Sequence, residues 1–370
     1  MKKLILINYA PPFTSIYKYT MEIASAFHGS VEIVHLMMSN RSGRWDSEIK
    51  GVLFGGISKN VFAVNLLLRK IGFRRAIKFI RERSDEETIV HYIHQNIRPL
   101  TVPDGRTVVT VHDNPETNLR FGVYSYDMGG LRERINFMIF SRSILKNYRM
   151  YSSFPNVLTN SNYVRKSLIN FGFRGKISAL YPPVGDHFKP LDNREELREK
   201  LGLPTNKILV LSVSSMHKRK NLDTVTKVMN DLGDDFALVR VGRSLGKDYS
   251  FRNVSPETIN EIYNACDVML IPSVEEGFGS PIPEALSVGL PVVASDIPVF
   301  KEAFGDAIIT SNPFDYRKLA NSIRYAVVNR EELSSRALRK SREFSFETFR
   351  MKINSYYENI INGKSNPPIL

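Results

Sequence analysis

The sequence predicts an α/β protein of two doubly wound domains, each built on a parallel β-sheet. Short apolar runs alternate with longer amphipathic segments along the chain, as they do in β-α-β units. The alternation is interrupted by Tyr-Pro-Pro-Val-Gly at 181–185 and then restarts. With 370 residues, 42% of them hydrophobic, the chain is long enough for two cores of ordinary size.

In the first half the patterns predict six strands and four helices. We expect the strands at 3–8, 31–35, 88–92, 107–111, 157–160 and 176–180, and the helices at 15–27, 61–83, 131–150 and 162–170. The first apolar run follows two lysines, as in a signal peptide, but Asn8 and Tyr9 interrupt it. We therefore interpret it as the first buried strand.

In the second half the same patterns predict a second sheet and a final helix. We expect the strands at 208–213, 237–241, 268–271, 292–294 and 307–309, and the helix at 346–361. The proline-glycine segment at 181–185 is typical of a linker. The predicted domains are therefore 1–184 and 185–345.

The formal charge of +13 lies in the N-terminal half. Residues 1–185 hold 26 Lys and Arg against 13 Asp and Glu, whereas 186–370 hold 25 of each. Two basic amphipathic segments, 69–83 and 131–150, favour peripheral contact with an anionic membrane or a polyanionic acceptor. The alternative is a helix that packs on the core and exposes a charged side. Nothing resembles a nucleic-acid module, so we expect no nucleic-acid partner.

The single cysteine, Cys266, excludes an internal disulfide and a cysteine-based metal cage. Such usage fits a reducing cytosol, and we expect Cys266 to pack in the core. The sequence has no long apolar span. We expect a cytoplasmic protein in peripheral contact with the inner membrane face.

The most informative segment is 275–285, Glu-Glu-Gly-Phe-Gly-Ser-Pro-Ile-Pro-Glu-Ala. It follows a short apolar run that ends at a proline, which predicts a loop at the carboxyl end of a buried strand. Two glycines permit a tight turn and a close approach to a ligand, and Pro281 suits the first turn of a helix. Glu276 and Glu284 are eight positions apart, so they are not an ordinary surface pair. The pattern favours a site for a sugar attached to a phosphate; the alternative is an acidic turn before a surface helix.

Residues 263–310 closely resemble the donor site of the retaining GT-B glycosyltransferases of family 4 (glycosyl transferases group 1). Their Glu-x7-Glu motif corresponds to Glu276 and Glu284, and the resemblance continues through Gly289 to Ser295 and Glu302. In outline it covers almost the whole chain. It implies the GT-B architecture, two Rossmann-like domains facing each other across a cleft, with a C-terminal helical segment, 346–370, that returns to the N-terminal domain.

The resemblance also assigns roles to residues of the donor side. It implies that Glu276 contacts the transferred sugar, that Glu284 binds the ribose, and that Lys220, with Arg219 as helper, binds the diphosphate. Their cationic charge would stabilise a departing nucleoside diphosphate. The loop residues implied to contact the donor are Gly277, Phe278, Gly279 and Ser280, and those near the base are Asn253 and Val254. Relatives usually have glycine where this chain has Ser214.

On the acceptor side the resemblance is weaker. The strand ending at His112 resembles the one whose histidine lines the sugar pocket, so His112 is a candidate catalytic-site residue. A lone histidine at a strand end is more often structural. Where many relatives carry two glycines, this chain has Thr14 and Ser15, whose hydroxyls can cap a helix and still donate to an anion.

The sequence thus predicts a retaining glycosyltransferase that uses a nucleotide-diphosphate sugar and acts on a glycan or lipid-linked acceptor in cell-surface glycan or glycolipid synthesis. We expect UDP or GDP as the nucleotide, no further cofactor and no metal, since the chain has no Asp-x-Asp. A covalent intermediate and front-face attack are both open, and we favour the latter. The alternatives are a GT-B epimerase or hydrolase that needs no acceptor, and a non-catalytic glycan- or membrane-binding protein.

Overall fold

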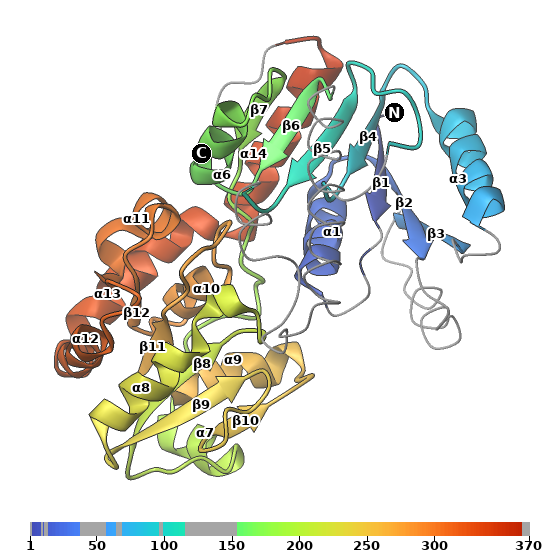
Figure 1. Cartoon of the computed structure of the whole chain (residues 1–370). Helices are drawn as coiled ribbons and strands as arrows, with labels where there is room; N and C mark the ends of the chain where they lie inside the picture. The colour runs from blue at the N-terminus through green and yellow to red at the C-terminus, as the bar shows by residue number, and fades with distance from the viewer. Residues whose placement is uncertain are drawn as a thin grey trace, which may run out of the picture. The chain divides into compact units, whose positions relative to one another are not determined.

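The structure is a computed structural model that describes residues 2–8, 10, 14–37, 57–63, 69–95, 99–114 and 154–364. For residues 37, 57–63 and 69–73 it describes the backbone. The described residues fold into two compact units, each with its own sheet (Figure 1). The first unit contains the described residues of 1–115 and 139–182 with 346–364, and the second contains 183–345.

The sheet of the first unit has the strand order β3-β2-β1-β4-β5-β6-β7 within the described residues, and every pairing is parallel. The strands are β1 (Lys3–Asn8), β2 (Ser30–Met37), β3 (Ile57–Ala63), β4 (Thr88–Tyr92), β5 (Thr107–Val111), β6 (Asn156–Thr159) and β7 (Lys176–Ala179). The order reverses between β1 and β4, where Lys3 lies opposite both Ser30 and Thr88. Strands β4, β5 and β6 are buried along their whole length, which explains why β-branched and apolar residues predominate in them.

Four helices of the first unit are described: α1 (Ser15–Ala26), α3 (Arg69–Arg83), α6 (Asn162–Asn170) and α14 (Phe346–Ile361). Hydroxyl side chains cap two of them, since Thr14 accepts from the backbone N–H of Tyr17 and Ser161 accepts from that of Val164. Helix α14 comes from the end of the chain and lies against α1 (Figure 1).

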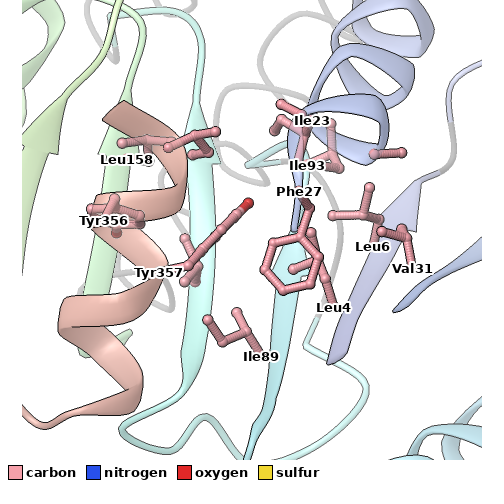
Figure 2. Packing of buried hydrophobic residues seen from close by; sticks show 14 of the residues in the cluster. Leu4, Leu6, Ile23, Phe27, Val31, Ile89, Ile93, Leu158, Tyr356 and Tyr357 are labelled. Atoms are coloured by element: carbon pink, nitrogen blue, oxygen red, sulfur yellow. The ribbon is translucent and has the colours of Figure 1, made fainter. Parts of the chain in front are cut away.

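The C-terminal helix α14 contributes to the core of the first unit. Figure 2 shows Tyr356 and Tyr357 of α14 beside buried residues of β1, β4, β6 and α1. The ring of Tyr357 meets that of Phe27 edge to face, with centroids 5.6 Å apart. The Tyr357 hydroxyl lies 2.7 Å from Nδ1 of His91, a buried strand residue. The first unit therefore depends on a segment distant in sequence.

The second unit has a parallel sheet of order β10-β9-β8-β11-β12-β13, which reverses between β8 and β11. Its strands are β8 (Ile208–Val213), β9 (Phe236–Val241), β10 (Tyr249–Phe251), β11 (Val268–Ile271), β12 (Val292–Ser295) and β13 (Ile309–Ser311). Its helices are α7 (Arg194–Lys200), α8 (Leu222–Leu232), α9 (Pro256–Ala265), α10 (Pro281–Ser287), α11 (Pro298–Phe304), α12 (Tyr316–Val328) and α13 (Arg330–Ser341), with 3-10 turns η1 (Lys218–Lys220), η2 (Gly305–Ala307) and η3 (Arg342–Phe344).

The predicted α/β class with two doubly wound parallel sheets is confirmed. The helix expected at 61–83 was wrong at its start: residues 57–63 form β3, paired with β2, and the helix begins at Arg69. Val61 and Phe62 are strand formers, and the available sheet edge outweighed the helical spacing. Strand β10 was not predicted, and the last strand begins at Ile309 because η2 occupies the preceding residues. The helix expected at 131–150 lies outside the described residues.

Replacing Asn354 by alanine should weaken the attachment of α14. Its buried amide donates to the carbonyl of Ala26 at 2.7 Å and accepts from the N–H of His28 at 3.0 Å, which closes the end of α1. Leaving these groups unpaired should lower the free energy of unfolding by about 1–3 kcal/mol, measured by urea denaturation. Met351→Ala, at an exposed position of the same helix, is the control and should change it by less than about 0.5 kcal/mol. Equal midpoints for the two variants would contradict this role.

Candidate functional site

The loops that follow β8 and β11 flank the point where the strand order of the second sheet reverses. In doubly wound sheets ligands bind at this point, beyond the carboxyl ends of the strands. Hydrogen bonds join the two loops: the N–H of Val274 donates to the carbonyl of Arg219 at 2.8 Å, and Nδ2 of Asn221 donates to that of Pro272 at 3.1 Å. Asn221 adopts the left-handed conformation, with φ 53°, which asparagine tolerates better than most residues. These hydrogen bonds hold the two site loops in a fixed arrangement.

Glu276 lies on the loop between β11 and α10 and is 4% exposed. Its Oε1 accepts from Nζ of Lys220 at 2.5 Å, and its Oε2 accepts from Nη1 of Arg219. Burial raises the pKa of Glu276, but the charges of Arg219 and Lys220 and the hydrogen bonds from Lys220 and Ser273 outweigh it and lower this pKa to about 2. Glu276 is therefore ionised at neutral pH.

The three side chains form one ion-paired cluster. Arg219 and Lys220, both from η1, converge on the carboxylate of Glu276. Fixed cations in a site shielded from water bind phosphate oxygens through charge-assisted hydrogen bonds. The Glu276 carboxylate thus lies where an external anion would meet both cations.

The glycine-containing loop after Glu276 is tightly constrained. Gly279 has φ +91°, and a Cβ there would lie 2.6 Å from Cε1 of Phe300, so a side chain would meet both strain and a clash. Phe278 is buried, and its ring packs near those of Phe304 and Phe344. Gly277 is buried, whereas Ser280 is exposed and makes no side-chain cap to α10. Phe278 therefore anchors the loop in the core.

Glu284 lies on α10 and has a different partner. The hydroxyl of the buried Tyr263 donates to Oε2 of Glu284 at 2.8 Å. Burial, followed by the charge of Glu284, raises the pKa of Tyr263 far above its usual range, so the phenol remains a donor. The structure thus holds Glu276 with cations and Glu284 with a neutral hydroxyl.

The remaining candidates of the second unit lie between β10 and α9. Asn253 is exposed in the left-handed conformation, with φ 50°, and Val254 is partly buried. In the first unit, Thr14 caps α1, as its hydroxyl was expected to do, and Ser15 is exposed as the first helical residue. The roles of these four residues stay predictions.

His112 follows β5 in the first unit, and both its backbone N–H and its backbone carbonyl are hydrogen-bonded. Its N–H donates to Oε1 of Gln95 at 3.1 Å, and its carbonyl accepts from Nδ2 of Asn160 at 2.8 Å. Its Nε2 lies 2.8 Å from the carbonyl of Ile93, so Nε2 carries the proton and donates. Burial lowers the pKa of His112, so the ring is neutral and its Nδ1 is the acceptor nitrogen.

Sequence reasoning missed Asn221, Tyr263 and Arg240. Asn221 joins the two site loops, and an asparagine directly before an apolar helix is a signal for a left-handed turn. Tyr263 had no local signal, because its partner Glu284 belongs to another helix. Arg240 is a charged residue inside the apolar strand β9, and this interruption of the pattern could have drawn attention to it.

Within the described part of the chain no helix has both the length and the apolarity needed to span a bilayer. Nor do three His, Cys, Asp or Glu side chains gather among these residues in a way that could hold a metal ion. Cys266 is buried, as expected for a core residue.

Residues 193–344 match the family described as Glycosyl transferases group 1. They form a glycosyl transferases group 1 domain. It contains Arg219, Lys220, Glu276 and Glu284, whereas His112 and Thr14 precede it.

Glycosyltransferases are among the proteins similar in sequence to this chain. The O-antigen biosynthesis glycosyltransferase WclY of Escherichia coli is 27% identical over 203 residues, which cover 51% of this chain and 56% of WclY. The alpha-galactosylglucosyldiacylglycerol synthase of Streptococcus pneumoniae is 22% identical over 303 residues, 74% of this chain and 81% of that protein. The match to WclY thus spans little more than half of that relative's length.

Among solved structures, Anabaena HepE in complex with UDP-glucose superposes with a TM-score of 0.77 at 16% identity. The superposition covers 97% of this chain and 100% of HepE. This similarity concerns the fold, which is that of GT-B glycosyltransferases, as expected from the sequence.

Acid should destabilise the second unit through Glu276. Because its pKa in the folded protein, about 2, lies below the ordinary 4.5, its ionised form contributes stability that is complete above about pH 5 and is lost as the pH falls toward about 2. Glu276→Gln removes this contribution. We expect the difference in unfolding free energy between the wild type and this variant to be largest at pH 7 and to shrink at pH 3, by urea denaturation.

The matched control is Glu331→Gln, at an exposed position of α13. Its difference from the wild type should stay small across the same pH range. A difference for Glu276→Gln that is constant from pH 7 to pH 3 would contradict the buried ionised carboxylate.

Proposed function

We propose that this protein is a retaining glycosyltransferase of family 4 that transfers a sugar from a nucleotide-diphosphate sugar to a glycan or lipid-linked acceptor. The observation that carries the proposal is the buried cluster of Glu276, Arg219 and Lys220 at the strand-order reversal of a glycosyl transferases group 1 domain. The relatives named for O-antigen biosynthesis and for diacylglycerol glycolipid synthesis support an acceptor on a cell-surface glycan or a glycolipid.

In this proposal the two cations of η1 bind the diphosphate of the donor. As the sugar leaves, negative charge accumulates on the phosphate oxygens, and cations already fixed in position stabilise it without reorganisation. The diphosphate must compete with the carboxylate of Glu276 for Arg219 and Lys220. Donor binding would then release Glu276 from one or both cations and leave it available to the transferred sugar.

The other donor contacts follow from the loops. Glu284, fixed by Tyr263, would accept hydrogen bonds from the ribose hydroxyls, and the backbone of Gly277 to Ser280 would lie along the donor. Asn253 and Val254 would contact the base, with UDP or GDP as the nucleotide. The reaction would proceed without a metal ion, because Lys220 and Arg219 supply the positive charge, and retention would result from front-face attack.

His112 belongs to this proposal as a residue of the transferred sugar's pocket. Its neutral ring and its acceptor nitrogen Nδ1 suit a sugar hydroxyl better than an anion. Thr14 and Ser15 would belong to the acceptor side.

Donor binding is the first test. A thermal-shift screen against UDP-, GDP-, ADP- and dTDP-sugars, without added metal and in the presence of EDTA, should single out one nucleotide. Incubation of the preferred donor alone then separates transfer from epimerisation or hydrolysis, which need no acceptor. If none of the donors binds with or without a divalent ion, the proposal is wrong.

Two substitutions in the cluster should have opposite effects on affinity for the free nucleoside diphosphate. Lys220→Ala removes a cation and should weaken binding and lower turnover by about 10²–10³-fold. Glu276→Gln removes the competing carboxylate and should bind the diphosphate at least as tightly as the wild type while losing turnover. Calorimetry and a donor-consumption assay measure the two quantities.

Lys218→Ala is the matched control, because Lys218 is an exposed cation of the same turn. It should retain affinity and turnover within about twofold. Weaker diphosphate binding by Glu276→Gln would argue against competition between this carboxylate and the ligand.

We further propose a cytoplasmic protein in peripheral contact with an anionic membrane through 69–83 and 131–150. The second segment lies outside the described residues. In the first, Ala76 and Ile80 are buried, while Arg74, Arg75 and Lys78 are exposed. The apolar side of α3 is thus covered by the unit's own core, and contact would be electrostatic at the surface.

Charge reversal tests this contact. Arg74→Glu, Arg75→Glu and Lys78→Glu combined should reduce cosedimentation with vesicles of phosphatidylglycerol and phosphatidylcholine by about tenfold or more at low salt, because each surface cation near anionic lipid contributes about 1 kcal/mol. About 0.5 M NaCl should remove wild-type binding as well. A control of equal charge reverses three exposed cations of the second unit, Lys227, Arg317 and Lys318. If both triple variants lose binding equally, net charge rather than α3 is responsible.

A further inference from the structure

Arg240 is a fully buried cation at the carboxyl end of β9. It lies opposite Ser212 of β8 in the sheet register and is 0% exposed. Its Nη1 donates to Oγ of Ser212 at 2.9 Å and to Oγ of Ser214 at 3.0 Å, and its Nη2 donates to the carbonyl of Ser214 at 3.1 Å. The guanidinium therefore spans the ends of two adjacent strands.

This position is energetically unfavourable for an arginine. Each of these acceptors is a neutral hydroxyl or carbonyl oxygen, and no carboxylate among the described residues lies within ion-pair distance of Arg240. Its Nε is buried without a hydrogen-bond partner. Burial lowers the pKa of Arg240, and the charge of Asp248 opposes this only in part. An apolar side chain of similar size would avoid these costs, so stability alone does not account for the charge.

The guanidinium holds two loops that leave adjacent strands. Besides Ser214 after β8, it reaches the carbonyl of Arg243 after β9 at 3.4 Å. The loops also touch directly, because a Cβ on Gly242 would lie 2.4 Å from the carbonyl oxygen of Ser214, and Gly242 has φ +143°. The loop that begins at Ser214 continues into η1, which carries Arg219 and Lys220.

We propose that Arg240 is a positioning residue for diphosphate binding. Through Ser214 it fixes the start of the loop that carries Arg219 and Lys220, and its buried charge adds a positive field behind that loop which solvent screens poorly. Ser214 takes part through both its hydroxyl and its carbonyl, each of which accepts from the guanidinium of Arg240. The inference rests on the proposed function, because it concerns the same ligand.

The decisive variant is Arg240→Met, which keeps an unbranched side chain and removes its charge. Calorimetry with UDP and GDP, and with uridine and guanosine, separates the diphosphate from the nucleoside. We expect diphosphate affinity to fall by about tenfold or more, while the nucleoside keeps its affinity within about twofold and the thermal midpoint is unchanged or higher. Arg240→Lys, which keeps the charge, should recover part of the loss. Arg317→Met, on the exposed surface of α12, is the matched control and should bind as the wild type does.

Unchanged diphosphate affinity in Arg240→Met would overturn the proposal. An equal loss for diphosphate and nucleoside, with a lower thermal midpoint and no recovery in Arg240→Lys, would show a structural role and would also overturn it. If Arg240→Met fails to fold, Ser214→Ala decides: its diphosphate affinity should fall at least about threefold, and wild-type affinity would overturn the proposal. If the wild type binds none of these diphosphates, the proposed function itself is contradicted. The outcomes above concern Arg240 alone, because each of them requires a wild type that binds a diphosphate.

Discussion

The second unit depends on the buried negative charge of Glu276. A carboxylate that is 4% exposed stays ionised only if nearby cations offset its loss of hydration, and Arg219 and Lys220 do so from a loop 56 residues earlier in the chain. The requirement works in both directions. The cations keep Glu276 ionised, and the carboxylate holds them close together at the strand-order reversal, where they would otherwise repel each other.

Positive charge in the second unit is thus arranged at two depths. Arg219 and Lys220, on the loop that follows β8, contact the carboxylate of Glu276. Arg240 is more deeply buried and donates hydrogen bonds to neutral oxygens at the start of the same loop. Stability alone would favour an ion-pair partner for Arg240 or an apolar residue in its place. Under the proposed function, these cations would stabilise the negative charge of the leaving group in a low-dielectric setting.

Three histidines of the first unit, on or directly after β4 and β5, are neutral at pH 7. Burial lowers the pKa of His91 to about 3, lowers that of His94 well below its usual value, and lowers that of His112 as well. Amides of Gln95 and Asn160 bond to the backbone of His112. Such groups exchange hydrogen bonds with hydroxyls at little electrostatic cost, whereas Arg74, Arg75 and Lys78 of α3 are exposed. The described polar groups of the two units thus differ: the Glu276 cluster of the second unit is charged, and these histidines of the first unit are neutral.

The sequence by itself determined the α/β class, the two parallel sheets and most of their strands, because buried parallel strands are continuous apolar runs that local pattern reveals. It also singled out Glu276, Arg219 and Lys220 as residues for one ligand through a family resemblance, although their roles stay predictions. Local pattern failed at β3, where a sheet edge decided the conformation of residues with mixed propensity. The local pattern also could not show which side chain each charged residue contacts. The tertiary structure decided these pairings, because the partners come from different strands, helices and loops. It pairs Glu276 with two cations, Glu284 with Tyr263, and Arg240 with Ser212 and Ser214.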